Sequence, residues 1–386
     1  MKKNLVVLFF AVTILTMNNY SFGQVSKNKL IITDTISSQI LNSNRVIDIY
    51  LPTNYFNTND TYPIQVIIGH KQRSSMYYEI SNYLGEPYHL ENGTLHTIPE
   101  TIVIGFRTLN GGRELHYKND WASINKFISQ ELITYISNKY RTNGYKTLIG
   151  HSIGGGFVLK SMLSNSSDFN AYYCTSPTES KYLITLIRES FLQNDITSIN
   201  KKKLILACGK MDKEIPFVEN EELINELLKI NHENFSFKYI ELDNANHHSI
   251  YPATITDALL FMFEDWGFKL TKSQTYNATE LLIKHYSNLS SKTGISIIPP
   301  ENDFYLLTYL LFTRNNTDEK IIALKKCKEY YPKARMADAY LARTYYMIND
   351  FENATIFNNK ALQLNAGNKF AIETRDMLKK RVISAT

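Results

Sequence analysis

The fold of this chain is decided by one stretch, Thr147-Leu148-Ile149-Gly150-His151-Ser152-Ile153-Gly154-Gly155-Gly156-Phe157. A short apolar run precedes the serine, and a helical pattern over residues 157–163 follows it. Glycines on either side of Ser152 leave room for a tight turn in which larger side chains would collide. A Gly-x-Ser-x-Gly motif between a strand and a helix is typical of the turn that exposes a nucleophilic serine. We therefore predict that Ser152 is a nucleophile.

The surrounding chain, from about residue 30 to residue 268, alternates short β-rich runs with helical patterns, which indicates a mostly parallel sheet covered by helices. Several runs are apolar throughout, as expected for strands buried on both faces. The candidate strands are residues 46–51, 64–68, 101–104, 145–149, 203–207 and 236–242. One amphipathic helix is predicted from four apolar residues spaced four apart, namely Ile124, Ile128, Leu132 and Ile136. The predicted fold class is α/β, a doubly wound α/β-hydrolase sheet.

A nucleophilic serine needs a base, and the base needs an acid that orients it. In a doubly wound hydrolase the chain order is Ser, acid, His, with the acid and the His in loops after late strands. Asp212 lies in such a loop and is the predicted acid, with Glu214 and Asp243 as alternatives. His247 lies in the loop after the last candidate strand and is the predicted base, with His248 as the alternative.

An oxyanion hole needs two backbone N–H groups that point at the charge developing on the substrate. Ile153 directly follows the nucleophile and is expected to supply one of them. The loop after residues 64–68 is expected to supply the other, from His70 or Lys71. This machinery requires neither a metal ion nor a cofactor.

After about residue 269 the strand pattern stops. Residues 269–300 are predicted to be a linker with a connecting helix, and residues 301–386 a helical domain. The tail repeats with a period of 34 residues, in which Leu307, Thr308, Leu311, Cys327 and Pro332 are matched by Leu341, Ala342, Tyr345, Ala361 and Ala366. This pattern resembles tetratricopeptide repeats (TPR), with an ordinary helical hairpin as the alternative. We therefore predict a small all-α TPR-like domain after the sheet.

Near the start of the chain, Lys2 and Lys3 precede an apolar stretch up to about Met17, which is followed by small residues that include Gly23. This layout is typical of a secretory signal peptide, here residues 1–23. The apolar stretch is shorter than the roughly 20 residues that a membrane-spanning helix needs. An uncleaved anchor is the alternative. We expect an exported protein, periplasmic or secreted, without a transmembrane segment.

Composition narrows the class of protein. Apolar residues make up 44% of the 386 residues, which supports a buried core and argues against wholesale disorder. The net charge of +5 is small and no basic stripe is present, so nothing indicates nucleic-acid binding. Cys174, Cys208 and Cys327 have the spacing of neither a metal site nor a redox pair. We expect all three to be buried apolar residues.

Several ordered pieces carry a family resemblance. They are Arg45-Val46-Ile47-Asp48-Ile49-Tyr50-Leu51-Pro52, Ile102-Val103-Ile104-Gly105-Phe106 with Arg113 downstream, Gly150-His151-Ser152-Ile153-Gly154-Gly155, Ser176-Pro177 and His247-His248-Ser249. In this order they resemble the putative esterase family, which includes esterase D-type enzymes, enterochelin esterases and feruloyl esterase modules. The last piece favours His247 over His248. Two departures concern the site: His70-Lys71 stands where relatives often carry Asp-Gly, and Ser176-Pro177-Thr178 lacks a following aromatic pair.

The resemblance covers about residues 44–268. It implies that the α/β-hydrolase domain, predicted over residues 24–268, hydrolyses a carboxylic ester through an acyl-enzyme intermediate. Arg113 and His151 are expected to contact the substrate, although Arg113 is equally suited to pairing with a local carboxylate. The expected substrate is a small-molecule or carbohydrate-linked ester, siderophore esters included. Two alternatives remain. One is a hydrolase-fold scaffold whose TPR-like tail binds a partner protein, and the other is an acyltransferase that uses the same triad.

Overall fold

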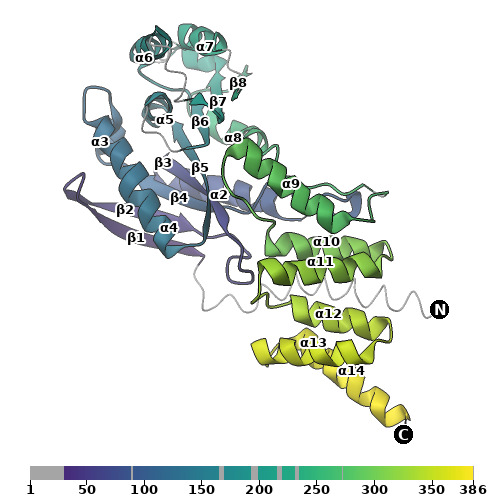
Figure 1. The fold of residues 1–386 in the computed structure, drawn as a ribbon. Helices are drawn as coiled ribbons and strands as arrows, with labels where there is room; N and C mark the ends of the chain where they lie inside the picture. Colours follow the sequence, from purple (N-terminus) through teal and green to yellow (C-terminus); the bar gives the residue numbers. More distant parts are fainter. Residues whose placement is uncertain are drawn as a thin grey trace.

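The computed structural model describes residues 30–87, 90–164, 169–192, 199–214, 220–230, 234–271 and 273–385 (Figure 1). The predicted signal peptide, residues 1–23, lies outside the described residues. The described chain forms a domain built on a β-sheet, followed by a region made only of helices. The predicted fold class, an α/β-hydrolase sheet followed by an all-α part, is confirmed.

Eight strands form one sheet in the order β1-β2-β4-β3-β5-β6-β7-β8. Their bounds are β1 Ile31–Ser38, β2 Ser43–Tyr50, β3 Tyr62–Gly69, β4 Ile102–Arg107, β5 Thr142–His151, β6 Ala171–Thr175, β7 Lys202–Gly209 and β8 Phe235–Leu242. β2 pairs antiparallel with β1 and β4, and every other neighbouring pair is parallel. The candidate strands correspond to six of the eight. β1 was not predicted because an edge strand with alternating exposed residues lacks the apolar run that indicated the other strands. β6 was not predicted because it is only 5 residues long.

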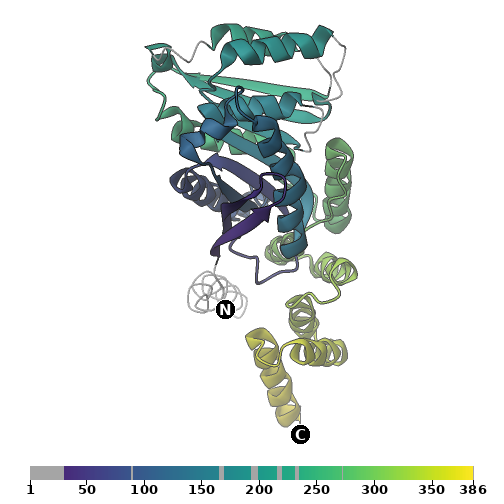
Figure 2. The same ribbon diagram turned by 90° about the vertical axis from the view of Figure 1, so that its left-hand side faces the viewer.

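Helices cover both faces of the sheet (Figures 1 and 2). α2 (Lys71–Gly85) and α8 (Ile250–Met262) share a hydrophobic cluster with Ile67 and Ile149 of the sheet. The opposite face, which includes Ile68 and Leu148, belongs to a second cluster with the remaining helices of this domain. Those helices are α3 Trp121–Lys126, α4 Ile133–Lys139, α5 Ile153–Leu163, α6 Ser180–Leu192 and α7 Glu221–Leu228. Neighbouring strand residues thus enter opposite clusters, which is why the strands are apolar throughout.

The predicted amphipathic helix contains a π-helical segment, η3 (Phe127–Leu132), between α3 and α4. Its four predicted core residues are all buried: Ile124, Ile128, Leu132 and Ile136. A spacing of four residues drifts by about 40° per step on a regular α-helix, because one turn takes 3.6 residues. The wider π turn offsets this drift and keeps the four side chains on the sheet.

The C-terminal region consists of α9 Ala278–Thr293, α10 Glu301–Thr313, α11 Thr317–Tyr330, α12 Ala337–Met347, α13 Phe351–Leu364 and α14 Lys369–Ala385. Helices α10 to α14 extend away from the sheet as a stacked array (Figures 1 and 2). The hydrophobic cluster of α2 and α8 continues into this region through Leu282, Phe304 and Leu311. The tail is therefore packed against the sheet domain. Its helical character is confirmed, and its assignment to tetratricopeptide repeats stays a prediction.

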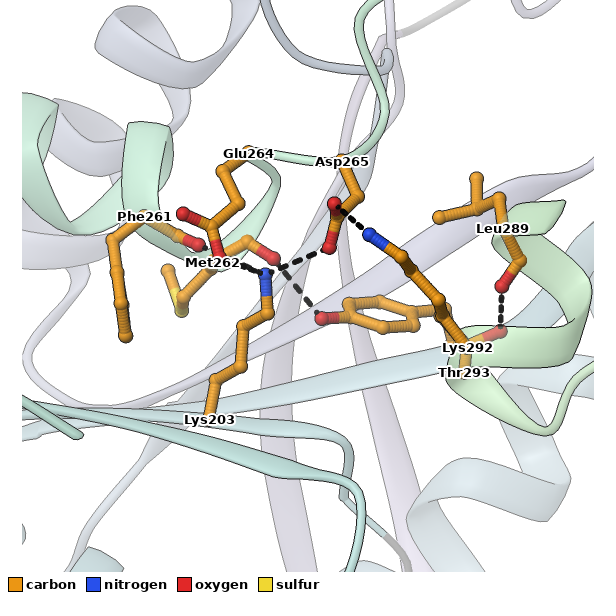
Figure 3. Close-up of polar contacts among 9 residues, drawn as sticks. Lys203, Phe261, Met262, Glu264, Asp265, Leu289, Lys292 and Thr293 are labelled. Atoms are coloured by element: carbon orange, nitrogen blue, oxygen red, sulfur yellow. Dashed lines mark hydrogen bonds and ion pairs between the residues drawn. The ribbon is translucent and has the colours of Figure 1, made fainter. Parts of the chain in front are cut away.

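Charged side chains tether α9 to the sheet domain (Figure 3). Lys292 Nζ of α9 lies 2.6 Å from Asp265 Oδ1, in the segment after α8. Lys203 Nζ of β7 lies 2.8 Å from Glu264 Oε1 and 3.4 Å from Asp265 Oδ2. The segment predicted as a linker therefore contains a helix that is held at both its apolar face and its carboxyl end.

Candidate active site

Ser152 occupies a strained turn between β5 and α5. Its backbone has φ 59° and ψ −122°, a conformation that non-glycine residues rarely adopt. The Ser152 N–H donates to the carbonyl oxygen of Thr175 at 2.9 Å, which ties the turn to β6. A Cβ on Gly150 would lie 2.2 Å from the carbonyl oxygen of Gly154, so only glycine fits there. The turn therefore holds the serine at the carboxyl edge of the sheet.

His247 approaches this serine from the loop between β8 and α8. Its Nε2 lies 2.9 Å from Ser152 Oγ, which is hydrogen-bond distance. The Asn246 side chain accepts hydrogen bonds from the N–H groups of His248 and Ser249, each at 3.0 Å. Ser249 Oγ in turn accepts from the Asn246 N–H at 2.9 Å. These local bonds fix the loop that presents His247.

Asp212 lies on the other side of the His247 ring, in the 3-10 turn η5 (Lys210–Glu214). Its carboxylate is buried, and Oδ2 accepts a hydrogen bond from Ser176 Oγ. Asp212 Oδ1 lies 3.8 Å from His247 Nδ1, and both atoms are buried without a hydrogen-bond partner among the described residues. This separation is less than 1 Å longer than the usual donor–acceptor distance of a hydrogen bond. Catalytic hydrogen bonds are often long without substrate and shorten when it binds.

Burial lowers the pKa of His247 below its ordinary value, and the neighbouring Asp212 carboxylate opposes this shift. His248 and Arg73 add to the lowering, because positive charges disfavour a second one nearby. Burial also lowers the pKa of His151, to about 2. Both imidazoles are therefore neutral at pH 7, and His247 is able to accept a proton there.

The two backbone amides predicted as oxyanion donors lie at the starts of helices. Ile153 is the first residue of α5 and His70 immediately precedes α2, positions at which N–H groups lack intrahelical partners. In the sheet register Ile68 pairs with Gly150, so the segment after β3 begins beside the nucleophile turn. Lys71, the alternative to His70, is the first residue of α2. The structure thus brings both predicted segments to Ser152.

The other predicted site residues differ in burial and in the groups that they contact. His151 is only 2% exposed, its Nδ1 lies 2.8 Å from Thr175 Oγ1, and its ring centroid lies 4.6 Å from that of His247. His248 is exposed. Asp243 is also exposed and pairs with Lys210 Nζ at 2.7 Å. The side chain of the alternative acid Glu214 lies outside the described residues.

Arg113 lies in the 3-10 segment η2 (Asn110–Leu115) and is exposed. It lines a cavity of about 900 Å³ together with Arg45, Glu114 and Asp120. Neither Ser152 nor His247 is among the described residues that line this cavity. The same segment contacts the site at another point, because a Cβ on Gly112 would lie 2.9 Å from Ile153 Cγ2. The substrate contact predicted for Arg113 remains a prediction.

Sequence reasoning missed two residues of the site. Ser176 donates to Asp212 and has a positive φ of 42°, a second strained position beside the nucleophile. Arg73, in the first turn of α2, places its charge near His151 and His247. Ser176 belonged to the Ser-Pro segment of the family resemblance, which was a usable signal. Arg73 had no such signal, since one arginine in a polar helix start is unremarkable.

Other expectations concern metals, thiols and membranes. Within the ranges that the structure describes, no cluster of three or more His, Cys, Asp or Glu side chains could hold a metal ion. Cys174, Cys208 and Cys327 are free thiols and buried, as predicted. None of the described helices is long and apolar enough to cross a membrane.

A strained serine in hydrogen-bond contact with a histidine, at the edge of a largely parallel sheet, agrees with the sequence match. Residues 38–204 match the Putative esterase family. The predicted resemblance is confirmed, and the match agrees with the predicted enzyme class, a carboxylic ester hydrolase. The chain is similar to the Ferri-bacillibactin esterase BesA of Bacillus subtilis (strain 168), at 24% identity over 151 residues. That alignment covers 37% of this chain and 51% of the relative, so the chain spans about half the length of this curated relative.

Solved structures share the fold of the sheet domain. An IroE-like serine hydrolase from Shewanella oneidensis superposes with a TM-score of 0.66 at 19% identity, covering 78% of this chain and 99% of its own. An uncharacterised protein from Capnocytophaga ochracea DSM 7271 gives a TM-score of 0.58 at 18% identity, covering 87% of this chain and 99% of its own. Both matches cover more of the chain than the sheet domain contains, so both extend into the helical region.

Proposed function

We propose that the protein is a serine esterase in which Ser152 is the nucleophile, His247 the general base and Asp212 the orienting acid. The observation that carries the proposal is the 2.9 Å contact between Ser152 Oγ and His247 Nε2 at a strained strand-to-helix turn. The buried Asp212 carboxylate facing the far side of the same ring supports it. The family match supports the ester as the bond that is cleaved.

The reaction follows from this geometry. His247 Nε2 takes the proton of Ser152 Oγ while the oxygen attacks the ester carbonyl carbon. The amides of Ile153 and His70 stabilise the negative charge on the carbonyl oxygen. The imidazolium then gives its proton to the departing alcohol, which leaves an acyl group on Ser152. Water, deprotonated by the same His247, attacks this acyl group and releases the acid.

Asp212 acts on His247 in both steps. A carboxylate beside Nδ1 favours the tautomer that leaves Nε2 free to accept a proton, and it stabilises the imidazolium that forms. The hydrogen bond from Ser176 keeps the carboxylate in place. Because Asp243 is exposed and paired with Lys210, Asp212 is the better of these two candidates.

Labelling and turnover test the proposal together. The wild-type protein is expected to react with a fluorophosphonate probe and to hydrolyse p-nitrophenyl acetate. Ser152→Ala is expected to lose the label and at least about 10⁴-fold of kcat, because the nucleophile is absent. A folded wild type that neither labels nor turns over esters would contradict the proposal. Transfer of the acyl group to an added alcohol faster than to water would favour the acyltransferase alternative.

A siderophore or a related small ester is the substrate class that the comparisons favour. The relative from Bacillus subtilis is named as an esterase of ferri-bacillibactin. Carbohydrate-linked esters are the second class to test. Export to the periplasm or the exterior remains part of the proposal, and it rests on the predicted signal peptide at residues 1–23.

The helical tail is proposed to support the esterase domain. Its first helices share a hydrophobic cluster with the face of the sheet that α2 and α8 cover. The alternative is a scaffold whose tail binds a partner protein. It predicts that the Ser152→Ala variant still binds this partner. If cells that carry the Ser152→Ala variant lose ester hydrolysis but keep the wild-type phenotype, the scaffold alternative is favoured.

A further inference from the structure

Arg73 lies beside the nucleophile turn. It is in the first turn of α2, three residues after His70. Its Nη1 lies 3.3 Å from the position that a Cβ of residue 69 would occupy. The guanidinium therefore lies directly beside the backbone of Gly69. Gly69 has φ 141° and follows Ile68, the register partner of Gly150. The guanidinium therefore lies at the carboxyl edge of the sheet, near the turn that carries Ser152.

The groups around Arg73 belong to the active site. Its charge acts on His151, His247 and Tyr251. α2, which carries Arg73, packs against α8, which begins three residues after His247. The hydroxyl of Tyr251 is buried and has no hydrogen-bond partner within the described part of the chain. A half-buried cation thus lies near the catalytic histidine, and an unused buried hydroxyl belongs to Tyr251, whose ring centroid lies 6.1 Å from that of His151.

No carboxylate among the described residues is paired with Arg73. Other arginines of the chain have such partners: Arg45 binds Glu114, Arg107 binds Asp48, Arg188 binds Glu222 and Glu226, and Arg343 binds Glu373. A half-buried guanidinium without an anion is costly, since burial removes hydration that no partner replaces. It also opposes the positive charge that His247 acquires during the reaction. An anion brought by the substrate would relieve both effects.

We propose that Arg73 is a specificity-determining residue that binds an anionic group of the substrate, such as a carboxylate, close to the scissile ester. The planar guanidinium suits this ligand because it offers two parallel N–H donors to two oxygens. The proposal rests on the esterase function of Ser152 and adds a substrate class to it. It also assigns the charged contact with the substrate to Arg73 rather than to Arg113, which the sequence analysis expected to contact the substrate.

Paired esters test the proposal on both sides of the scissile bond. For the acyl side, p-nitrophenyl hydrogen glutarate is compared with p-nitrophenyl pentanoate, after subtraction of spontaneous hydrolysis. For the alcohol side, 4-carboxyphenyl butyrate is compared with 4-carbamoylphenyl butyrate. The readout is the ratio of kcat/KM for the anionic and neutral member of each pair. This ratio does not depend on the fraction of folded enzyme, so a destabilised variant remains informative.

Wild type is expected to favour the anionic member of at least one pair about tenfold, a modest value for a charged hydrogen bond. Arg73→Gln is expected to abolish this preference, and Arg73→Lys to keep part of it. Lys126→Gln, which removes an exposed charge from α3, is expected to keep the full preference. Arg113→Gln is also expected to keep it.

Three results would overturn the proposal: no preference in wild type for either pair, an undiminished preference in Arg73→Gln, or its loss in Arg113→Gln. Fluorophosphonate labelling separates this failure from a failure of the esterase function. Labelled enzyme without a charge preference rejects only the role of Arg73. Unlabelled enzyme that hydrolyses none of the four esters rejects both.

Discussion

Two serines of the proposed active site have unusual backbone conformations. Ser152 and Ser176 both have positive φ, although neither is glycine. Such conformations cost about 1–3 kcal/mol each and persist only where the surroundings enforce them. Here hydrogen bonds to neighbouring strands do so, from Ser152 to Thr175 and from Ser176 to Ala207, both at 2.9 Å. The strain presents Ser152 Oγ to His247 and directs Ser176 Oγ to Asp212.

The pH dependence of catalysis belongs to this scale. The base acts only when neutral, so kcat/KM is expected to rise with pH around a midpoint below 6.5, because burial lowers the pKa of His247. Asp212, His151, His248 and Arg73 surround this ring. In Asp212→Asn, loss of the carboxylate is expected to lower the midpoint further and kcat by about 10²–10⁴-fold. Steady-state pH–rate profiles measure both effects.

The matched control for this substitution is Asp243→Asn. Asp243 is exposed, and its charge is paired with Lys210 rather than with His247. Both the midpoint and the rate are expected to stay as in wild type. A larger loss of kcat in Asp243→Asn than in Asp212→Asn would show that Asp243 is the acid and would refute the proposed triad.

At the scale of elements, the glycines that open α5 allow a close approach of helix and sheet. A Cβ on Gly155 would lie 2.9 Å from the Thr175 carbonyl oxygen and 3.3 Å from Pro177 Cα. One on Gly156 would lie 2.7 Å from the Thr178 carbonyl oxygen. These contacts explain why two poor helix formers, Gly155 and Gly156, stand in the first turn. The helix must pass close to the backbone that follows β6.

Gly155→Ala is therefore expected to destabilise the fold by about 1–3 kcal/mol, since the backbone atoms it meets cannot yield cheaply. Helix propensity alone predicts the opposite sign, a gain of up to about 1 kcal/mol. Urea unfolding measures the difference. Gly85→Ala is the control, because its nearest contact would be 3.5 Å and its φ is ordinary. A stabilised Gly155→Ala variant would show that close packing does not determine this position.

At the scale of the whole molecule, buried polar groups join the helical tail to the sheet domain. Asp60 accepts hydrogen bonds from the N–H groups of Glu301 and Asn302, at the start of α10. The Glu301 side chain accepts from the Asn59 N–H at 2.9 Å. Asp303 Oδ2 lies 3.2 Å from His96 Nε2. These contacts join the sheet domain to the tail across a long stretch of sequence. We therefore expect the tail and the sheet domain to unfold together.

This junction is expected to weaken as pH rises. Burial raises the pKa of Asp60 to about 7, so between about pH 4 and 7 the folded state keeps a proton that the unfolded state has lost. Burial alone would lower the pKa of His96, but Asp303 beside it raises the value above the ordinary one, and this contribution also disappears as pH rises. The contribution of Asp60 alone is expected to fall by about 2 kcal/mol from pH 5.5 to 7.5.

Asp60→Asn tests this expectation, because an amide does not titrate. The free energy of unfolding, measured in urea at both pH values, is expected to depend less on pH in this variant than in wild type. Asp257→Asn, which removes an exposed carboxylate on α8, is expected to leave the dependence unchanged. A dependence as steep in Asp60→Asn as in wild type would exclude Asp60 as its source.

Local patterns determined most of the fold and the order of the site. Apolar runs revealed six strands, four-residue spacing revealed the helix that contains the π turn, and glycines around Ser152 predicted the nucleophile turn. These features depend on neighbours within a few residues, which a sequence displays directly. The presence of acid and histidine loops after late strands was also predictable, since parallel strands all end at the same edge.

Only the tertiary structure decided which side chains meet. Asp212 and Asp243 both follow late strands, yet one is buried beside His247 and the other is exposed beside Lys210. The register of β3 and β5 brings the segment that carries Arg73 beside Ser152, while Arg113 lines a cavity whose described lining includes neither Ser152 nor His247. The docking of the tail depends on Asp60 and Glu301, which are 241 residues apart. Such contacts arise from strand order and helix packing, and the spacing of residues along the chain does not encode them.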